Sequence, residues 1–169
     1  LVELDCESGH VTCHGKIVEK MKKLQRREGP FCLNGSMLAG NELLMAMAGS
    51  NHVAVMNLDT GAFQAYEVGE ETDNYCCMAG RKETYILGSN EGRKLTYWNR
   101  KTGETEERTG YPNGWEGETE CFYEMICMDN LVYVFPWKGN MILRISLESP
   151  GITQVFQGRG QEEPRKEYY

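Results

Sequence analysis

One short turn motif, repeated four times, restricts the folds open to this sequence. The four copies begin at Asp5, Asn57, Asn99 and Ser146, and each ends at a glycine four or five residues later. The first side chain can accept hydrogen bonds from the backbone of the turn, and glycine readily adopts the positive φ that closes it. Alternating apolar residues flank the turns, so each copy predicts a β-hairpin.

The sequence around the second turn recurs around the third without a gap. A shift of 42 residues places Val53 and Asn57 on Leu95 and Asn99, and a third copy needs one extra residue, Pro150, in its turn. Each copy contains four short apolar stretches separated by turn residues, which predicts four strands. One twisted sheet of four strands cannot bury both of its faces alone, so we expect each unit to pack on its neighbours.

A different pattern interrupts the repeat at residues 16–28. Ile17, Met21 and Leu24 have helical spacing, and Gly29–Pro30 is a stop signal, so we predict a short amphipathic helix. Its six basic and two acidic residues give a net charge of +4. Such a charged face commonly meets water, and the alternative is that it binds a partner or a phosphate group.

These features divide the chain into a half unit at 1–14, the helix at 16–28, three full units at about 31–68, 72–110 and 118–158, and a polar tail at 159–169. The turn phrases VMNLDTG, YWNRKTG and RISLESPG resemble the outer hairpins of Kelch-like and quinoprotein-like β-propellers. The double glycine of Kelch blades and the terminal Trp-Asp of other propellers are missing. The resemblance implies an all-β fold of four-stranded antiparallel blades, three and a half in number, with one inserted helix.

An open stack of blades would leave apolar faces and strand edges exposed. We therefore expect either further blades from a longer chain or a homo-oligomer. Two copies of the leading half unit supply the same outer hairpin and cannot complete one blade together, which favours the longer chain.

Composition narrows the functional classes. The net charge of −7 argues against a nucleic-acid partner. Seven cysteines, an odd number, fit reduced thiols in the cytoplasm better than a disulfide framework. No apolar run is long enough to span a membrane. The sequence begins at Leu1, and a removed signal peptide would leave no trace.

The chemical motifs are few, and we predict neither a metal nor a cofactor. Cys6, His10, Cys13 and His14 are zinc-ligand types, but strand alternation directs the last two to opposite faces. The same argument predicts that Cys76 and Cys77 point to opposite sides of a strand and serve packing. No nucleophile elbow, phosphate-binding loop or His-Glu-x-x-His pair is present.

The resemblance to propellers implies a binding site at the mouth of a central channel, in the loops between blades and between second and third strands. Trp115 and Trp137 are either exposed aromatic anchors there or packing residues between blades. We predict a non-catalytic binding or scaffold module for a protein or glycan-like ligand. The alternatives are a propeller hydrolase or lyase, and recognition by the basic helix. The candidate ligand-binding residues are Trp115, Trp137, Tyr111, Arg93, Lys138, Asn140 and His52.

Overall fold

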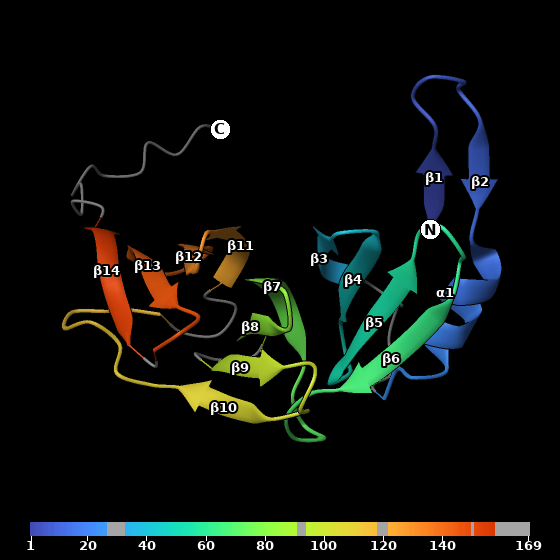
Figure 1. Cartoon of the computed structure of the whole chain (residues 1–169). Coiled ribbons are helices and arrows are strands. Elements are labelled where there is room, and N and C mark those ends of the chain that lie inside the picture. The colour runs from blue at the N-terminus through green and yellow to red at the C-terminus, as the bar shows by residue number, and fades with distance from the viewer. Residues whose placement is uncertain (27–32, 91–93, 118–121, 150, 158–169) are drawn as a thin grey trace, which may run out of the picture.

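The described part of the protein contains three four-stranded antiparallel sheets, one two-stranded hairpin and one helix (Figure 1). This computed structural model describes residues 1–26, 33–90, 94–117, 122–149 and 151–157. The all-β fold of propeller-like blades is confirmed, and the described blades do not close into a ring. The predicted polar tail at 159–169 lies outside the described residues.

The hairpin pairs β1 (Val2–Leu4) with β2 (Val11–Cys13). The first blade is formed by β3 (Leu33–Ala39), β4 (Glu42–Met47), β5 (His52–Asn57) and β6 (Phe63–Glu67). The second is formed by β7 (Tyr75–Arg81), β8 (Thr84–Ser89), β9 (Leu95–Asn99) and β10 (Thr105–Arg108). The third is formed by β11 (Phe122–Met128), β12 (Leu131–Pro136), β13 (Met141–Ser146) and β14 (Ile152–Gln157).

The strand register reproduces the 42-residue repeat. Glu42 lies opposite Asn57 in the first blade, and Thr84 lies opposite Asn99 in the second. The turns also agree in detail: the Asn57 Oδ1 accepts hydrogen bonds from the backbone amides two and three residues later, and Asn99 and Asp5 do the same. The glycines that close these three turns all have positive φ, near 70–80°. A local sequence signal therefore determines the outer hairpin of each blade.

Helix α1 (Gly15–Lys22) is shorter than the predicted 16–28. After Lys22 the chain tightens, because the amide of Leu24 bonds to the carbonyl of Met21, and the amide of Arg26 then bonds to the carbonyl of Gly49 in the first blade. The bond to Gly49 holds the segment against the first blade. Leu24 keeps the helical spacing of the apolar residues and packs on the same cluster, although the helix ends at Lys22. Residues 27 and 28 lie outside the described residues. No helix in the described part of the chain has the length and apolarity to cross a membrane.

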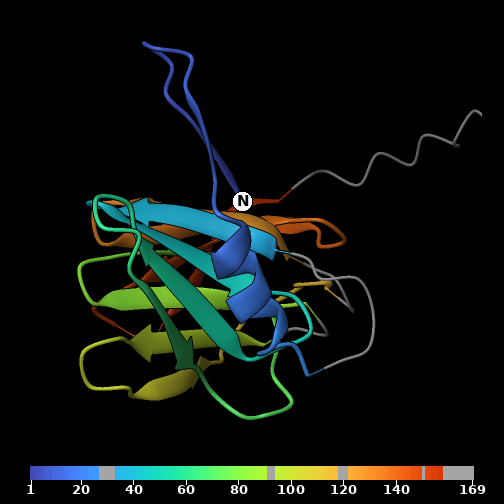
Figure 2. The same ribbon diagram turned by 90° about the vertical axis from the view of Figure 1, so that its right-hand side faces the viewer.

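The helix covers one face of the first blade, as Figure 2 shows. Its buried side chains, Ile17 and Met21, pack in one cluster with Met45, Met47, Ala54 and Met56 of β4 and β5. The predicted apolar stripe is thus confirmed, and its partner is the first blade. The hairpin β1–β2 projects away from the sheets (Figures 1 and 2).

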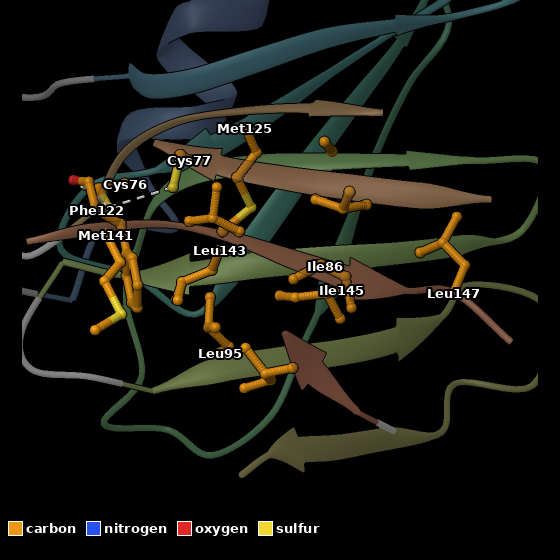
Figure 3. Packing of buried hydrophobic residues seen from close by; sticks show 14 of the residues in the cluster. Cys76, Cys77, Ile86, Leu95, Phe122, Met125, Met141, Leu143, Ile145 and Leu147 are labelled. Atoms are coloured by element: carbon orange, nitrogen blue, oxygen red, sulfur yellow. Dashed lines mark hydrogen bonds between the residues drawn. The ribbon is translucent and has the colours of Figure 1, made fainter. Parts of the chain in front are cut away.

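The innermost strands β3, β7 and β11 lie next to one another, and the blades stack face to face. Gly35 permits the close approach of β3 to β7, because a Cβ there would lie 2.7 Å from the Cys77 Cα. Residues on one face of each blade meet the opposite face of the next. Figure 3 shows the larger cluster, between the second and third blades, in which Ile86 and Leu95 pack near Leu143 and Ile145.

The prediction for the adjacent cysteines was wrong. The register of β7 against β8 shifts between Tyr75 and Cys77, which is a bulge with two residues opposite one. Both thiols therefore enter the same buried cluster, with their Sγ atoms 3.8 Å apart (Figure 3). The hydrogen bond between the two thiols holds the pKa of the Cys76 thiol below its usual value. Both still serve packing, as expected.

An ion pair joins the first two blades at the opposite end from their blade-joining loops. Both guanidinium Nη atoms of Arg100 donate to the carboxylate of Glu42, and the guanidinium also lies 5.2 Å from the ring centroid of Tyr66. The hydrogen bonds from Arg100 hold the pKa of Glu42 below its usual value. The contact links β4 and β6 of the first blade to the turn after β9 of the second.

Candidate functional site

Two aromatic side chains of the third blade stack on each other in solvent. Trp137, directly after β12, is 62% exposed, and Tyr123 of β11 is 61% exposed. Their ring centroids are 5.3 Å apart with an interplanar angle of 24°. The register of β11 shifts between Phe122 and Glu124, so Tyr123 leaves the regular alternation of the strand. Exposed apolar side chains that lie together in this way are typical of sites that bind a ligand or a partner.

A hollow of about 270 Å³ begins beside this pair. It is formed by the innermost strands of all three blades, where the channel of a propeller would run. Its lining residues carry an amide, two hydroxyls, a carboxylate, a thiol and two thioethers. The lining residues are Asn34, Gly35, Ser36, Cys77, Met78, Tyr123, Glu124 and Met125. Since Tyr123 belongs to both features, the pair and the hollow form one continuous surface, which we call the aromatic hollow.

Trp115 does not belong to this surface. It is 8% exposed and lies between Tyr111 and Phe122, with ring centroids at 5.7 and 6.3 Å. Gly117 and Gly139 face the indole so closely that a Cβ at either position would lie 2.5 Å from a ring atom. Of the two roles open to Trp115, packing is therefore the one that the structure shows.

Asn140 and His52 also lie apart from the aromatic hollow. Asn140 ties two loops together, because its Nδ2 donates to the carbonyl of Gly114 and its Oδ1 accepts from the amide of Glu116. His52 is buried at the start of β5, with Nδ1 2.7 Å from the Ser50 Oγ. Lys138 is exposed beside Trp137, and Arg93 lies outside the described residues.

The first turn offers no assembled metal site. The Nε2 atom of His14 lies 2.9 Å from a carboxylate oxygen of Glu3, while Cys6 and Cys13 are exposed free thiols. In the described ranges, no three His, Cys, Asp or Glu side chains are placed to hold a metal ion together.

Sequence reasoning missed Tyr123, Glu124, Asn34 and Ser36. All four lie in innermost strands, at the end where each strand begins. The usable signal was positional: in a propeller, the first strand of every unit lines the axis, so its polar residues face the channel. The exposure of Tyr123 depends on a bulge that strand alternation does not reveal.

Comparison with solved structures shows the fold. The chain is similar to a catalytically inactive virginiamycin B lyase from Staphylococcus aureus with quinupristin, at a TM-score of 0.59 and 18% identity, over 76% of this chain and 42% of that one. It is similar to a chain of a mitotic checkpoint complex at 0.56 and 13%, over 75% and 37%. The computationally designed protein Ika4 aligns at 0.55 and 11%, over 79% and 77%.

These similarities place the chain among the β-propellers, and identities this low carry no further meaning. The chain spans less than half the length of the virginiamycin B lyase and of the chain in the mitotic checkpoint complex. No known family and no curated protein matches the sequence.

Proposed function

We propose that this protein is a propeller-type binding module that recognises a protein partner through the aromatic hollow. The observation that carries the proposal is the exposed pair of Trp137 and Tyr123 at the edge of a polar hollow. Stacked aromatic rings lose little conformational freedom when a partner covers them, and such residues dominate protein interfaces. The hollow beside them would take one side chain of the partner.

The chemistry of the hollow suggests which side chain that is. Glu124 is the one carboxylate in the described lining, and Asn34 and Ser36 add neutral polar groups. A lysine or arginine of the partner would pair with Glu124 while its aliphatic stem contacts Met78 and Met125. The overall charge of −7 supports a basic partner segment as well.

A propeller lyase or hydrolase is the second candidate, because one protein with a similar fold is a virginiamycin B lyase. Its catalytic groups would have to converge on the same hollow. The described lining offers one carboxylate and no histidine, which supports binding better than acid-base chemistry.

Panning a random-peptide phage library on the full chain, with a glycan array in parallel, tests the proposal. We expect basic peptides that bind the wild type and lose about 30-fold in affinity to Trp137→Ala, as measured by calorimetry. Leu38→Ala is the control, because Leu38 is 64% exposed but lies at the other end of its strand. Recovery of binders that Trp137→Ala leaves unaffected, or of glycans alone, would overturn the proposal. A ligand recovered chemically changed would establish the enzyme instead.

A further inference from the structure

Two apolar surfaces at opposite ends of the molecule have no partner among the described residues. The first is one face of the hairpin β1–β2, where Val2, Leu4 and Val11 are 62%, 57% and 52% exposed. The other face of the hairpin is polar, with His14 bonded to Glu3. A three-residue strand pair with one apolar face in water is costly to expose.

The second surface is a face of the third blade. Met125, Val132, Leu143 and Ile145 pack against the second blade. Because strand side chains alternate, their neighbours point the other way. These neighbours form what we call the forward face: Ile126, Tyr133, Phe135 and Ile142. Ile126 is 46% exposed, and the other three are partly exposed.

The first two blades show what such a face contacts. The strand register equates Tyr133 with Leu44 and Ile86, and Ile142 with Val53 and Leu95. Those four equivalents are fully buried, because the next blade covers them. Arg144 also lies on this face, opposite Tyr133, where the other blades have Val55 and Tyr97. Apart from Arg144, the forward face of the third blade has the composition of an interface between blades.

The hairpin has the composition of the covering side. Its turn equates Leu4 with Met56, Trp98 and Ile145, and Val2 with Ala54, Thr96 and Leu143. In the second and third blades these residues face the preceding blade, and in the first they face α1. The opposite face of the hairpin is polar. It does not need to cover the first blade, because α1 covers that blade.

We propose that the hairpin β1–β2 of one copy packs on the forward face of the third blade of a second copy, head to tail. One chain carries both halves of the interface, and both follow the register by which the blades already stack. The hairpin does not complete a partner blade; it covers one. Such a heterologous contact closes into a ring or extends as a filament.

The test measures the mass of the full chain in solution by analytical ultracentrifugation. We expect the wild type to self-associate, and Leu4→Glu and Ile126→Glu each to weaken association at least about tenfold, because each would bury a carboxylate at the interface. Both residues are largely exposed, so the variants keep their fold, which circular dichroism verifies. Leu58→Glu, in the turn after β5, is the control and leaves the mass unchanged.

Mixing the two variants separates this interface from a symmetric one. Leu4→Glu retains the forward face and Ile126→Glu retains the hairpin, so an equimolar mixture is expected to regain one interface and form a heterodimer. Self-association through two hairpins or two forward faces would not be restored by mixing. A mixture that stays monomeric, or a monomeric wild type, overturns the proposal and assigns the two surfaces to other partners.

Discussion

At the scale of single residues, His52 shows how a packed position differs from a site. Its ring is buried, its Nδ1 atom lies next to the Ser50 hydroxyl, and its Nε2 atom is 3.6 Å from Glu67. Burial lowers its pKa, although Glu67 opposes that effect, and Arg26 adds to it. The imidazole is therefore neutral in the folded protein near neutral pH.

This predicts a pH dependence of stability. As the pH falls, His52 is protonated near pH 6.5 in the unfolded chain and at a lower pH in the folded protein. The free energy of unfolding is therefore highest above about pH 6.5 and decreases as the pH drops below it. His52→Gln should lower stability at pH 7 but flatten its decline between pH 7 and 5. Urea unfolding at several pH values measures both slopes. Parallel slopes for wild type and variant would contradict the assignment.

At the scale of elements, the turns and the inner strands use glycine for different reasons. Gly61 has φ of +68° and open space around it. Gly35 has no such φ, but a Cβ there would lie 2.7 Å from the Cys77 Cα and 2.9 Å from the Cys76 carbonyl oxygen. The first glycine serves local conformation, and the second serves contact between blades.

The two substitutions should therefore differ in cost. Gly61→Ala should lose about 1 kcal/mol of unfolding free energy, from backbone conformation alone. Gly35→Ala should lose more, about 1–3 kcal/mol or beyond, because backbone atoms of β7 must move. Urea unfolding of the wild type and both variants measures the two losses of unfolding free energy. A turn variant that is the less stable of the two would show that the blades are packed more loosely than this.

The contrast between local conformation and contact between blades also explains which features could be predicted from the sequence. The turns at Asn57 and Asn99 depend on side chains within three residues, so the hairpins and the repeat were predictable. The end of α1 depends on the bond between Arg26 and Gly49, and the positions of Cys76 and Tyr123 depend on bulges. For Trp137 and Trp115 the sequence allowed either an exposed or a packed side chain. Only the fold shows that Trp137 is exposed and Trp115 is buried.

At the scale of the whole molecule, the two ends of the stack are unequal. The first blade presents Met45, Met47, Ala54 and Met56 to α1, which shields them with Ile17 and Met21. Among the described residues, nothing corresponding covers the third blade. An amphipathic helix with a charged outer face is the kind of cap by which repeat proteins end a stack. Among the described basic residues of this segment, Lys22 pairs with Glu19 and Arg26 pairs with Glu67 of β6.

If α1 is a cap, loosening it should expose the face that it covers. Met21 is fully buried, so Met21→Ala should cost about 2–4 kcal/mol in urea unfolding. Met21→Asp should go further and detach the helix, because a carboxylate cannot be buried there without a partner. Binding of the dye ANS should then rise as the methionine-rich face of the first blade meets water, while the strand signal in circular dichroism persists.

The control is Glu19→Ala, on the exposed side of the same helix, where the ion pair with Lys22 contributes little. It should change neither stability nor ANS binding appreciably. If Met21→Asp unfolds the sheets together with the helix, then α1 is part of the cooperative core and not a separable cap. Retained sheets with a newly exposed face would instead show that this blade could accept a neighbour in place of its helix, since the facing surfaces of the three described blades are buried by sheets.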